Sequence, residues 1–166
     1  MRYLNHAAAV AICVLLAACS KGTEETGGGS STAATTAPAG PTEAQKVAAL
    51  ATLPAPYNTG DLANGQSRFA LCRSCHTIAE GGPALTGPNL YGVFGRQAGT
   101  VADYSYSAAV KGAGFVWDGE HLDKWLADPR GFLPGTKMSF AGLKDPKDRI
   151  DLIAYLKVET GYKAAP

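Results

Sequence analysis

Two cysteines and a histidine stand together at residues 72–76 (CRSCH). Thiols at this spacing can add to the two vinyl groups of one porphyrin, and the histidine after them can reach the iron; C-x-x-C-H is the attachment signature of a c-type haem. A zinc site usually needs a second pair of ligands, but the other cysteines, Cys13 and Cys19, lie in an N-terminal apolar segment. A thioredoxin-like pair belongs in a strand–helix context that is not apparent here. The motif therefore favours a covalent haem.

A second group able to bind iron lies well downstream. Apart from Met1, the only methionine is Met138, which ends the segment 134–138 (PGTKM). A single methionine usually fills a gap in a core, but its thioether can also be the sixth ligand of haem iron, and His/Met ligation raises the reduction potential. Pro134 and Gly135 restrict the loop that would present the sulfur. We therefore predict His76 and Met138 as the two axial ligands.

The elements that position these residues are predicted to be short helices joined by long loops. Helices are expected over residues 61–71, 104–110, about 120–128, and from 146 onward. Asp118 is expected to cap the third helix and Pro129 to end it. The last has the clearest start, with Asp145 as N-cap and Pro146 at the first helical position. Residues 42–53 also tolerate a short helix. The prediction is an all-α fold in which the haem supplies apolar bulk that the helices lack.

The N-terminus reads as an export signal. The apolar run at residues 7–18 has twelve residues, whereas a spanning helix needs about 20, so it fits the core of a signal peptide. It ends in residues 16–19 (LAAC), which look like a bacterial lipoprotein signal whose Cys19 becomes the lipidated first residue. Buried acyl CH₂ groups would anchor it at about 0.8 kcal/mol each. The alternatives are an ordinary signal peptide and an uncleaved anchor.

The chain is predicted to divide into a signal peptide (1–19), a linker (20–60) and one domain (61–163). The linker is rich in Gly, Ser, Thr, Ala and Pro, a composition that buries no core. Its r.m.s. reach as a flexible chain would be roughly 35 Å. Within 61–163, twelve Lys/Arg nearly balance eleven Asp/Glu, and no basic patch suited to nucleic acid is present.

Residues 61–163 resemble a class I cytochrome c of the mitochondrial and α-proteobacterial type. The matching segments occur in family order: CRSCHT (72–77), TGPNLYG (86–92), FGR (94–96), YSY (104–106), PGTKM with FAGL (134–138 and 140–143), and DLIAYLK (151–157). One departure is that Phe69 and Cys72 are one residue closer than in the mitochondrial proteins. The resemblance implies a small fold of three to five short helices and long loops around one haem c, bound through Cys72 and Cys75.

The resemblance also implies roles for other residues. The carbonyl of Pro88 would accept the second imidazole N–H of His76, which fixes the ring and raises its basicity. Gly65 would let the last helix cross closely. Residues implied to contact the haem propionates are Arg96, Tyr106, Trp117 and Thr136. Alternatively, Pro88 is a plain loop proline, Tyr106 and Trp117 are core aromatics, and Arg96 is a surface arginine. Trp125 stands where the mitochondrial relatives usually have a tyrosine facing the methionine sulfur.

By the same resemblance the protein would be a one-electron carrier and not an enzyme. Its partners would be a quinol–cytochrome c oxidoreductase and a haem–copper terminal oxidase, contacted near Lys137, Lys144 and Lys147. Its place would be the bacterial periplasm, with Cys19 as the membrane anchor. Tethering raises the effective concentration of the domain near its partners. A domain with balanced charge could therefore meet them without long-range electrostatic steering. The alternatives are a donor to another periplasmic reductase and, if Met138 does not bind iron, a haem peroxidase or gas sensor.

Overall fold

The structure is a computed structural model that describes residues 40–161. The predicted signal peptide (1–19) with Cys19, the first part of the predicted linker (20–39) and residues 162–166 lie outside the described residues. No helix between residues 40 and 161 is both long and apolar enough to cross a bilayer.

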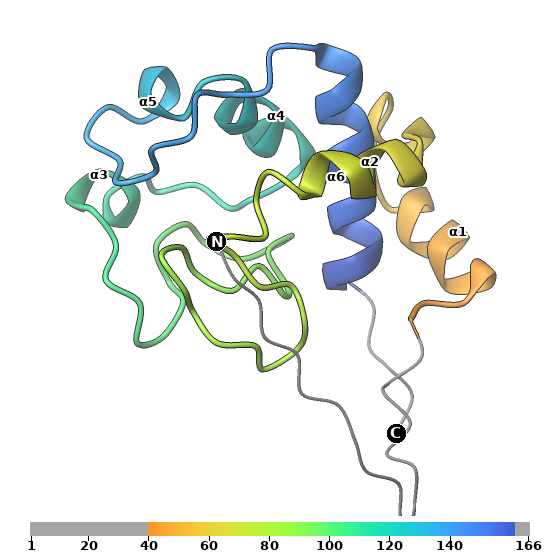
Figure 1. Ribbon diagram of the computed structural model, residues 1–166, viewed down its shortest axis with the longest axis horizontal. Coiled ribbons are helices and arrows are strands. Elements are labelled where there is room, and N and C mark those ends of the chain that lie inside the picture. Colours follow the sequence, from red (N-terminus) through yellow and green to blue (C-terminus); the bar gives the residue numbers. More distant parts are fainter. Residues whose placement is uncertain (1–39, 162–166) are drawn as a thin grey trace, which may run out of the picture. The chain divides into compact units, whose positions relative to one another are not determined.

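The described residues form helices joined by long loops, as Figure 1 shows. In chain order they are α1 (Glu43–Ala51), the 3-10 turn η1 (Tyr57–Thr59), α2 (Leu62–Phe69), α3 (Ala108–Lys111), α4 (Gly119–Ala127), α5 (Pro129–Phe132) and α6 (Pro146–Gly161). Within 40–161 there is no strand, and an isolated bridge joins Gln97 to Val116. The predicted all-α class is confirmed.

Side-chain caps set where most helices begin. Asp61 caps α2 by accepting from the amides of Ala63 and Asn64, and Asp118 caps α4 by accepting from the amide of His121 at 2.8 Å. Such caps satisfy amides that have no partner inside the helix. The predicted caps of α4 and α6 are both present, since the Asp145 carboxylate accepts from the amide of Lys147 at 2.8 Å.

Three helix boundaries differ from the predictions. α2 ends at residue 69 rather than 71, because the amides of residues 70–72 bond to carbonyls three residues earlier and tighten the chain into turns. α3 begins at residue 108 rather than 104, because the Ser107 hydroxyl caps it by accepting from the amide of Val110. Pro129 was expected only to end α4, but it also begins α5, whose cap is Asp128; proline suits the first helical position.

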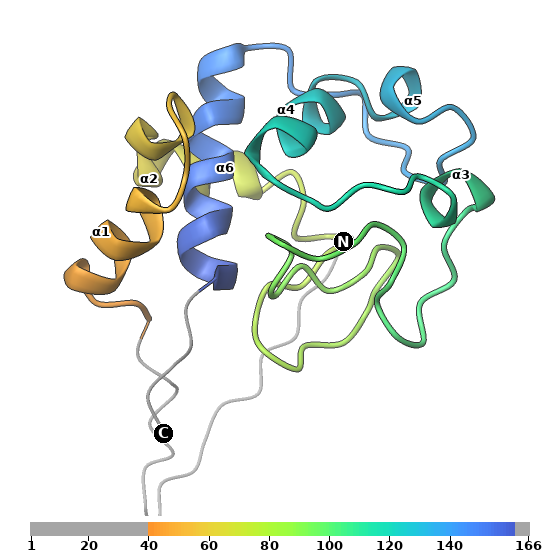
Figure 2. The ribbon, with the colours of Figure 1, turned by 180° about the vertical axis from the view of Figure 1, so that it is seen from behind.

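The crossing of α2 over α6 fixes the centre of the fold (Figures 1 and 2). Gly65 in α2 is buried, and a Cβ built on it would lie 2.6 Å from Cβ of Tyr155 and would overlap the backbone carbonyl of Asp151. Only glycine therefore allows this approach, as the family resemblance implied. The buried side of α6 is strongly apolar, since Leu152, Ile153 and Leu156 are at most 4% exposed.

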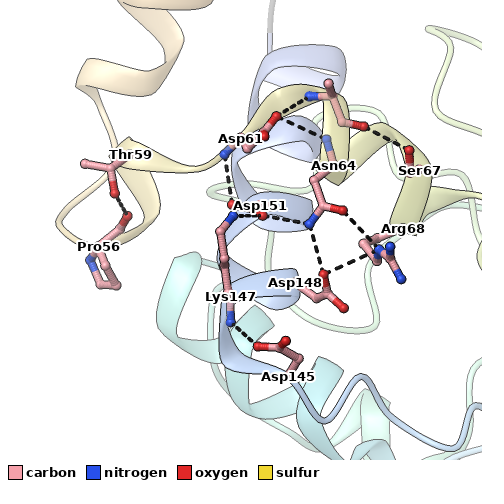
Figure 3. Close-up of polar contacts among 11 residues, drawn as sticks. Pro56, Thr59, Asp61, Asn64, Ser67, Arg68, Asp145, Lys147, Asp148 and Asp151 are labelled. Atoms are coloured by element: carbon pink, nitrogen blue, oxygen red, sulfur yellow. Dashed lines mark hydrogen bonds and ion pairs between the residues drawn. The ribbon is translucent and has the colours of Figure 1, made fainter.

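A polar network at the same crossing surrounds the carboxylate of Asp151, which is 2% exposed (Figure 3). It accepts from the amide of Asp61 at 2.8 Å, from Nδ2 of Asn64 at 2.7 Å and from Nζ of Lys147 at 2.6 Å. Burial alone would raise the pKa of Asp151, but the bonds from Lys147, Asn64 and Asp61 together hold that pKa below its ordinary value. The network ties the start of α2 to the first turns of α6.

The predicted linker is wrong over its last part, because residues 43–60 are folded onto the domain. Thr42 and Gln45 form a reciprocal capping box at the start of α1, which packs on α6. Leu53 and Tyr57 are 7% and 9% exposed and join the core cluster that includes Leu122 of α4. The physical reason is that a few well-placed apolar side chains gain enough by burial to order a segment of otherwise small residues.

We predict that Gly65→Ala destabilises the haem-loaded protein. The new methyl group meets backbone that cannot give way, and overpacking of this kind costs about 1–3 kcal/mol, more than the ~1 kcal/mol of helix propensity gained. Urea unfolding should show a lower midpoint. The matched control is Gly161→Ala, whose Cβ would lie 3.5 Å from the flexible Lys157 side chain. If both variants were as stable as the wild type, the crossing would not need glycine.

We predict that Asp151→Asn lowers the free energy of unfolding at pH 7 by about 2–3 kcal/mol, because hydrogen bonds to a buried charge are lost. A carboxyl group whose pKa is depressed by folding stabilises the protein above its unfolded pKa, and this contribution is lost as the pH falls through the folded value. The difference between variant and wild type should therefore shrink below about pH 4. Urea titrations at several pH values measure it, and a difference independent of pH would contradict the role of the charge.

Candidate haem-binding site

The residues from both predicted motifs meet in one cavity of about 310 Å³. It is lined by Cys72, Cys75, His76 and Met138. Met138 lies more than sixty residues after the C-x-x-C-H motif, so the fold brings two distant loops together. A volume of this order is typical of small-molecule sites. Apolar side chains that the sequence reasoning did not single out form much of its wall: Leu71, Leu90, Val93, Val110 and Leu122. They come from separate segments of the sequence, and only the fold brings them to one cavity.

The turns after α2 present the cysteines and the histidine together. The amide of Cys72 bonds to the Phe69 carbonyl at 2.8 Å, and the amides of Cys75 and His76 bond to the Cys72 carbonyl at 3.0 and 2.9 Å. Neither cysteine forms a disulfide within residues 40–161, so both sulfurs are available to a bound group. Burial, with a smaller effect of Cys75, raises the pKa of the Cys72 thiol to about 11. Among residues 40–161 no group of three or more His, Cys, Asp or Glu could hold a metal ion, which disfavours the zinc alternative.

The hydrogen bond of His76 determines which nitrogen is left for a metal. Nδ1 lies 2.8 Å from the carbonyl oxygen of Pro88. Because a carbonyl only accepts, Nδ1 carries the hydrogen and Nε2 keeps its lone pair. Burial lowers the pKa of His76, opposed by the bond to Pro88, and this favours the neutral ring that metal ligation requires. This is the contact that the family resemblance implied for Pro88.

The loop opposite the imidazole is shaped to let the ring approach. A Cβ built on Gly87 would lie 2.6 Å from both ring nitrogens of His76, so any larger residue would displace the ring. The amide of Gly87 bonds to the Cys75 carbonyl at 2.8 Å. The loop is thus fastened to the same turn that carries the thiols.

Asn89 organises this loop, and the sequence reasoning missed it. Its Nδ2 donates to the Thr77 hydroxyl at 2.7 Å and to the Ala79 carbonyl at 2.9 Å, and its Oδ1 accepts from the amide of Tyr91 at 2.8 Å. Thr77 in turn donates to the carbonyl of Pro83 at 2.7 Å. An asparagine in a Gly/Pro-rich stretch is the available signal, since its side chain readily bonds nearby backbone.

Arg96 brings a positive charge to the cavity. Its guanidinium donates to the carbonyls of Tyr91 at 2.9 Å and Asn89 at 3.2 Å, and burial lowers its pKa. Within residues 40–161 no carboxylate forms an ion pair with it. A partly buried cation of this kind suits an anionic group of a ligand.

The other residues assigned to the propionates also line the cavity. They are Tyr106, Trp117 and Thr136. The amide of Trp117 bonds to the carbonyl of Arg96 at 2.9 Å, so the two residues are held side by side. The Thr136 hydroxyl accepts from the amide of Met138 at 3.2 Å and so shapes the methionine loop. Thr136 therefore has a structural role in the methionine loop, independent of any contact with a ligand.

Aromatic groups of α4 and of the loop after Met138 also line the cavity. Trp125 packs edge-to-face on Trp117 with ring centroids 5.5 Å apart. Phe140 is a second aromatic residue of the lining. Two thiols, a neutral imidazole nitrogen, a thioether and a guanidinium that has no ion-pair partner among the described residues converge on the cavity. This set fits a covalently bound haem.

Comparison with known proteins gives the same assignment. Residues 62–158 match the family model of cytochrome c. Cytochrome c of Theileria parva is 52% identical over 99 residues, which are 59% of this chain and 85% of that protein. Cytochrome c of Nigella damascena is 49% identical over 102 residues, 61% of this chain and 92% of that protein. Among solved structures, cytochrome cH from Methylobacterium extorquens matches with a TM-score of 0.55 and 48% identity, over 59% of this chain and 98% of that one.

Because the family match spans more than half of the sequence and includes every residue that lines the cavity, the chain belongs to the cytochrome c family: it is an electron carrier with one covalently attached haem c.

Proposed function

We propose that the haem is held by thioether bonds to Cys72 and Cys75, with His76 and Met138 as axial ligands, and that the protein shuttles single electrons at a membrane. The observation that carries this proposal is the bond from Nδ1 of His76 to the Pro88 carbonyl. This bond leaves the lone pair of Nε2 free to bind iron, and both thiols and Met138 line the same cavity. The bound haem supplies an iron that alternates between ferrous and ferric states.

The residues around the iron favour its reduced form and leave it no open position. A thioether sulfur and an apolar lining stabilise the lower charge of ferrous iron, so the reduction potential is expected to be positive. With both axial positions filled by side chains, no substrate reaches the metal, and a carrier role follows rather than an enzymatic one. If Met138 were not a ligand, the peroxidase or gas-sensor alternative would regain support.

The remaining polar groups are assigned to the haem propionates. Arg96 provides the charge, with Tyr106 and Trp117 as neighbouring donors. A buried carboxylate needs such partners, and the guanidinium has donors beyond those used on the two backbone carbonyls. Thr136 is assigned mainly to holding the Met138 loop, where its hydroxyl is already engaged.

We propose a periplasmic location with Cys19 as the lipid anchor, and a quinol–cytochrome c oxidoreductase and a haem–copper oxidase as transient partners. The lipoprotein-like signal at residues 1–19 supports the anchor. The lysines expected to dock are already engaged within the protein: Lys137 on the Ser105 carbonyl, Lys144 on the Ala127 carbonyl and Lys147 on Asp151. We therefore assign docking mainly to Leu71, an apolar residue that is 57% exposed and also lines the cavity.

The ligand assignment predicts the behaviour of Met138→Ala. The wild-type chain, purified from its native host, should carry the added mass of one haem. Its ferric form should show the weak long-wavelength band of a methionine–iron bond. The variant should keep the haem, lose the band, and have a midpoint potential lower by on the order of 0.1 V. The control is Val47→Ala, at an apolar residue of α1 that is 67% exposed and does not line the cavity. A variant with an unchanged band would exclude Met138 as the ligand.

The anchor assignment predicts that Cys19→Ser moves the protein from the membrane fraction to the soluble periplasmic fraction. Loss of the acyl chains removes the apolar groups that hold it to the bilayer. The matched control is Cys13→Ser, which lies inside the apolar run of the signal and should leave the protein membrane-bound. Fractionation followed by haem staining measures the distribution. Retention of the Cys19 variant in the membrane would instead favour an uncleaved signal anchor.

A further inference from the structure

Residues 43–60 form a folded extension that precedes the family match at residues 62–158. Two of its side chains, Leu53 and Tyr57, are buried in the cluster that also contains Leu122 and Leu126 of α4 and Leu143. The extension therefore completes the packing behind α4, although it lies outside the part of the chain that the family shares.

The Tyr57 ring of the extension packs against the first residue of α4. Gly119 is the first residue of α4 and is buried. A Cβ built on it would lie 2.7 Å from Cδ2 of Tyr57, so the ring rests directly on the helix backbone. Among residues 40–161 no hydrogen bond of the Tyr57 hydroxyl is present. The contact is therefore one of packing, and the ring rather than the hydroxyl should matter.

α4 also borders the haem cavity, which Leu122 and Trp125 line. The last turn of α4 holds the chain that follows Met138, because the Leu126 carbonyl accepts from the amide of Leu143 at 2.7 Å. α4 thus contacts both the Tyr57 ring and the segment that follows the methionine.

We propose that Tyr57 is a positioning residue for the methionine ligand: by packing on Gly119 it holds α4, and through α4 it keeps the Met138 loop closed on the haem. The inference rests on the proposed role of Met138. The histidine side does not depend on this contact, because His76 is fixed by its own turn and by the Pro88 carbonyl.

Removal of the ring leaves a space behind the start of α4. Cores relax only in part around such a space, and a helix that shifts into it withdraws support from the Met138 loop. The form in which the methionine has left the iron then becomes more populated. An external ligand that binds only that form gains apparent affinity in proportion to its population.

The test uses the full haem-loaded chain and imidazole as the external ligand of ferric iron. The variants are Tyr57→Ala, Tyr57→Leu, which loses the ring but keeps apolar bulk, and Tyr57→Phe, which loses only the hydroxyl. The control is Val158→Ala, at a residue of α6 that is 1% exposed and neither lines the cavity nor joins the cluster. The readouts are the imidazole Kd, the methionine–iron band, and hydrogen exchange of the amides in residues 133–144.

We expect Tyr57→Ala to tighten imidazole binding by about tenfold, weaken the band and speed exchange in residues 133–144. The imidazole affinity of Tyr57→Leu should lie between those of Tyr57→Ala and the wild type, and that of Tyr57→Phe should match the wild type. Val158→Ala should lower the unfolding midpoint and leave imidazole binding unchanged. Equal effects of Val158→Ala and Tyr57→Ala on binding, or none from Tyr57→Ala, would overturn the inference. A wild-type chain without the methionine–iron band would instead refute the proposed function itself.

Discussion

The close approach of α2 to α6 is the contact on which the haem cavity depends. Gly65 allows the two backbones to touch, and the buried carboxylate of Asp151 holds the start of α2 in register with α6. α2 ends at Phe69, whose carbonyl accepts the amide of Cys72. The position of both thiols and of His76 is therefore set by a crossing that contains no haem-binding residue.

The polar groups assigned to the haem site include two that have a defined partner within the protein. Nδ1 of His76 is used by Pro88, and the Thr136 hydroxyl by the amide of Met138. The guanidinium of Arg96 is held by backbone carbonyls but has no carboxylate among the described residues. Since unpaired polar groups are costly in an apolar site, the arrangement limits what can occupy the cavity to a largely apolar group that also carries an anion.

The sequence was sufficient for the features that depend on local chemistry. The C-x-x-C-H motif, the single downstream methionine and the aspartate caps of α4 and α6 are each recognisable within a few residues. The tight approach at Gly65 followed from the family resemblance. The ends of α2 and α3 could not be placed, because they depend on turn hydrogen bonds and on the Ser107 cap.

The features that sequence reasoning missed depend on contacts between distant segments. Residues 43–60 contain only scattered apolar side chains between prolines, so nothing local shows that Leu53 and Tyr57 are buried against α4 and α6. Asn89 gives only a weak turn signal, but in the fold it bonds three segments of one loop. Long-range packing of this kind has no periodic signature in the sequence.

The folded extension also changes the reach of the proposed tether. With residues 43–60 packed on the domain, the chain between Cys19 and the fold shortens from about forty residues to about twenty. For a linker of this composition, the r.m.s. reach expected from the sequence falls from roughly 35 Å to about 26 Å. A shorter tether confines the haem domain to a smaller volume near the membrane and raises its effective concentration for partners there. A domain with nearly balanced charge, and with Lys137, Lys144 and Lys147 engaged internally, would therefore rely on confinement rather than on long-range electrostatic attraction.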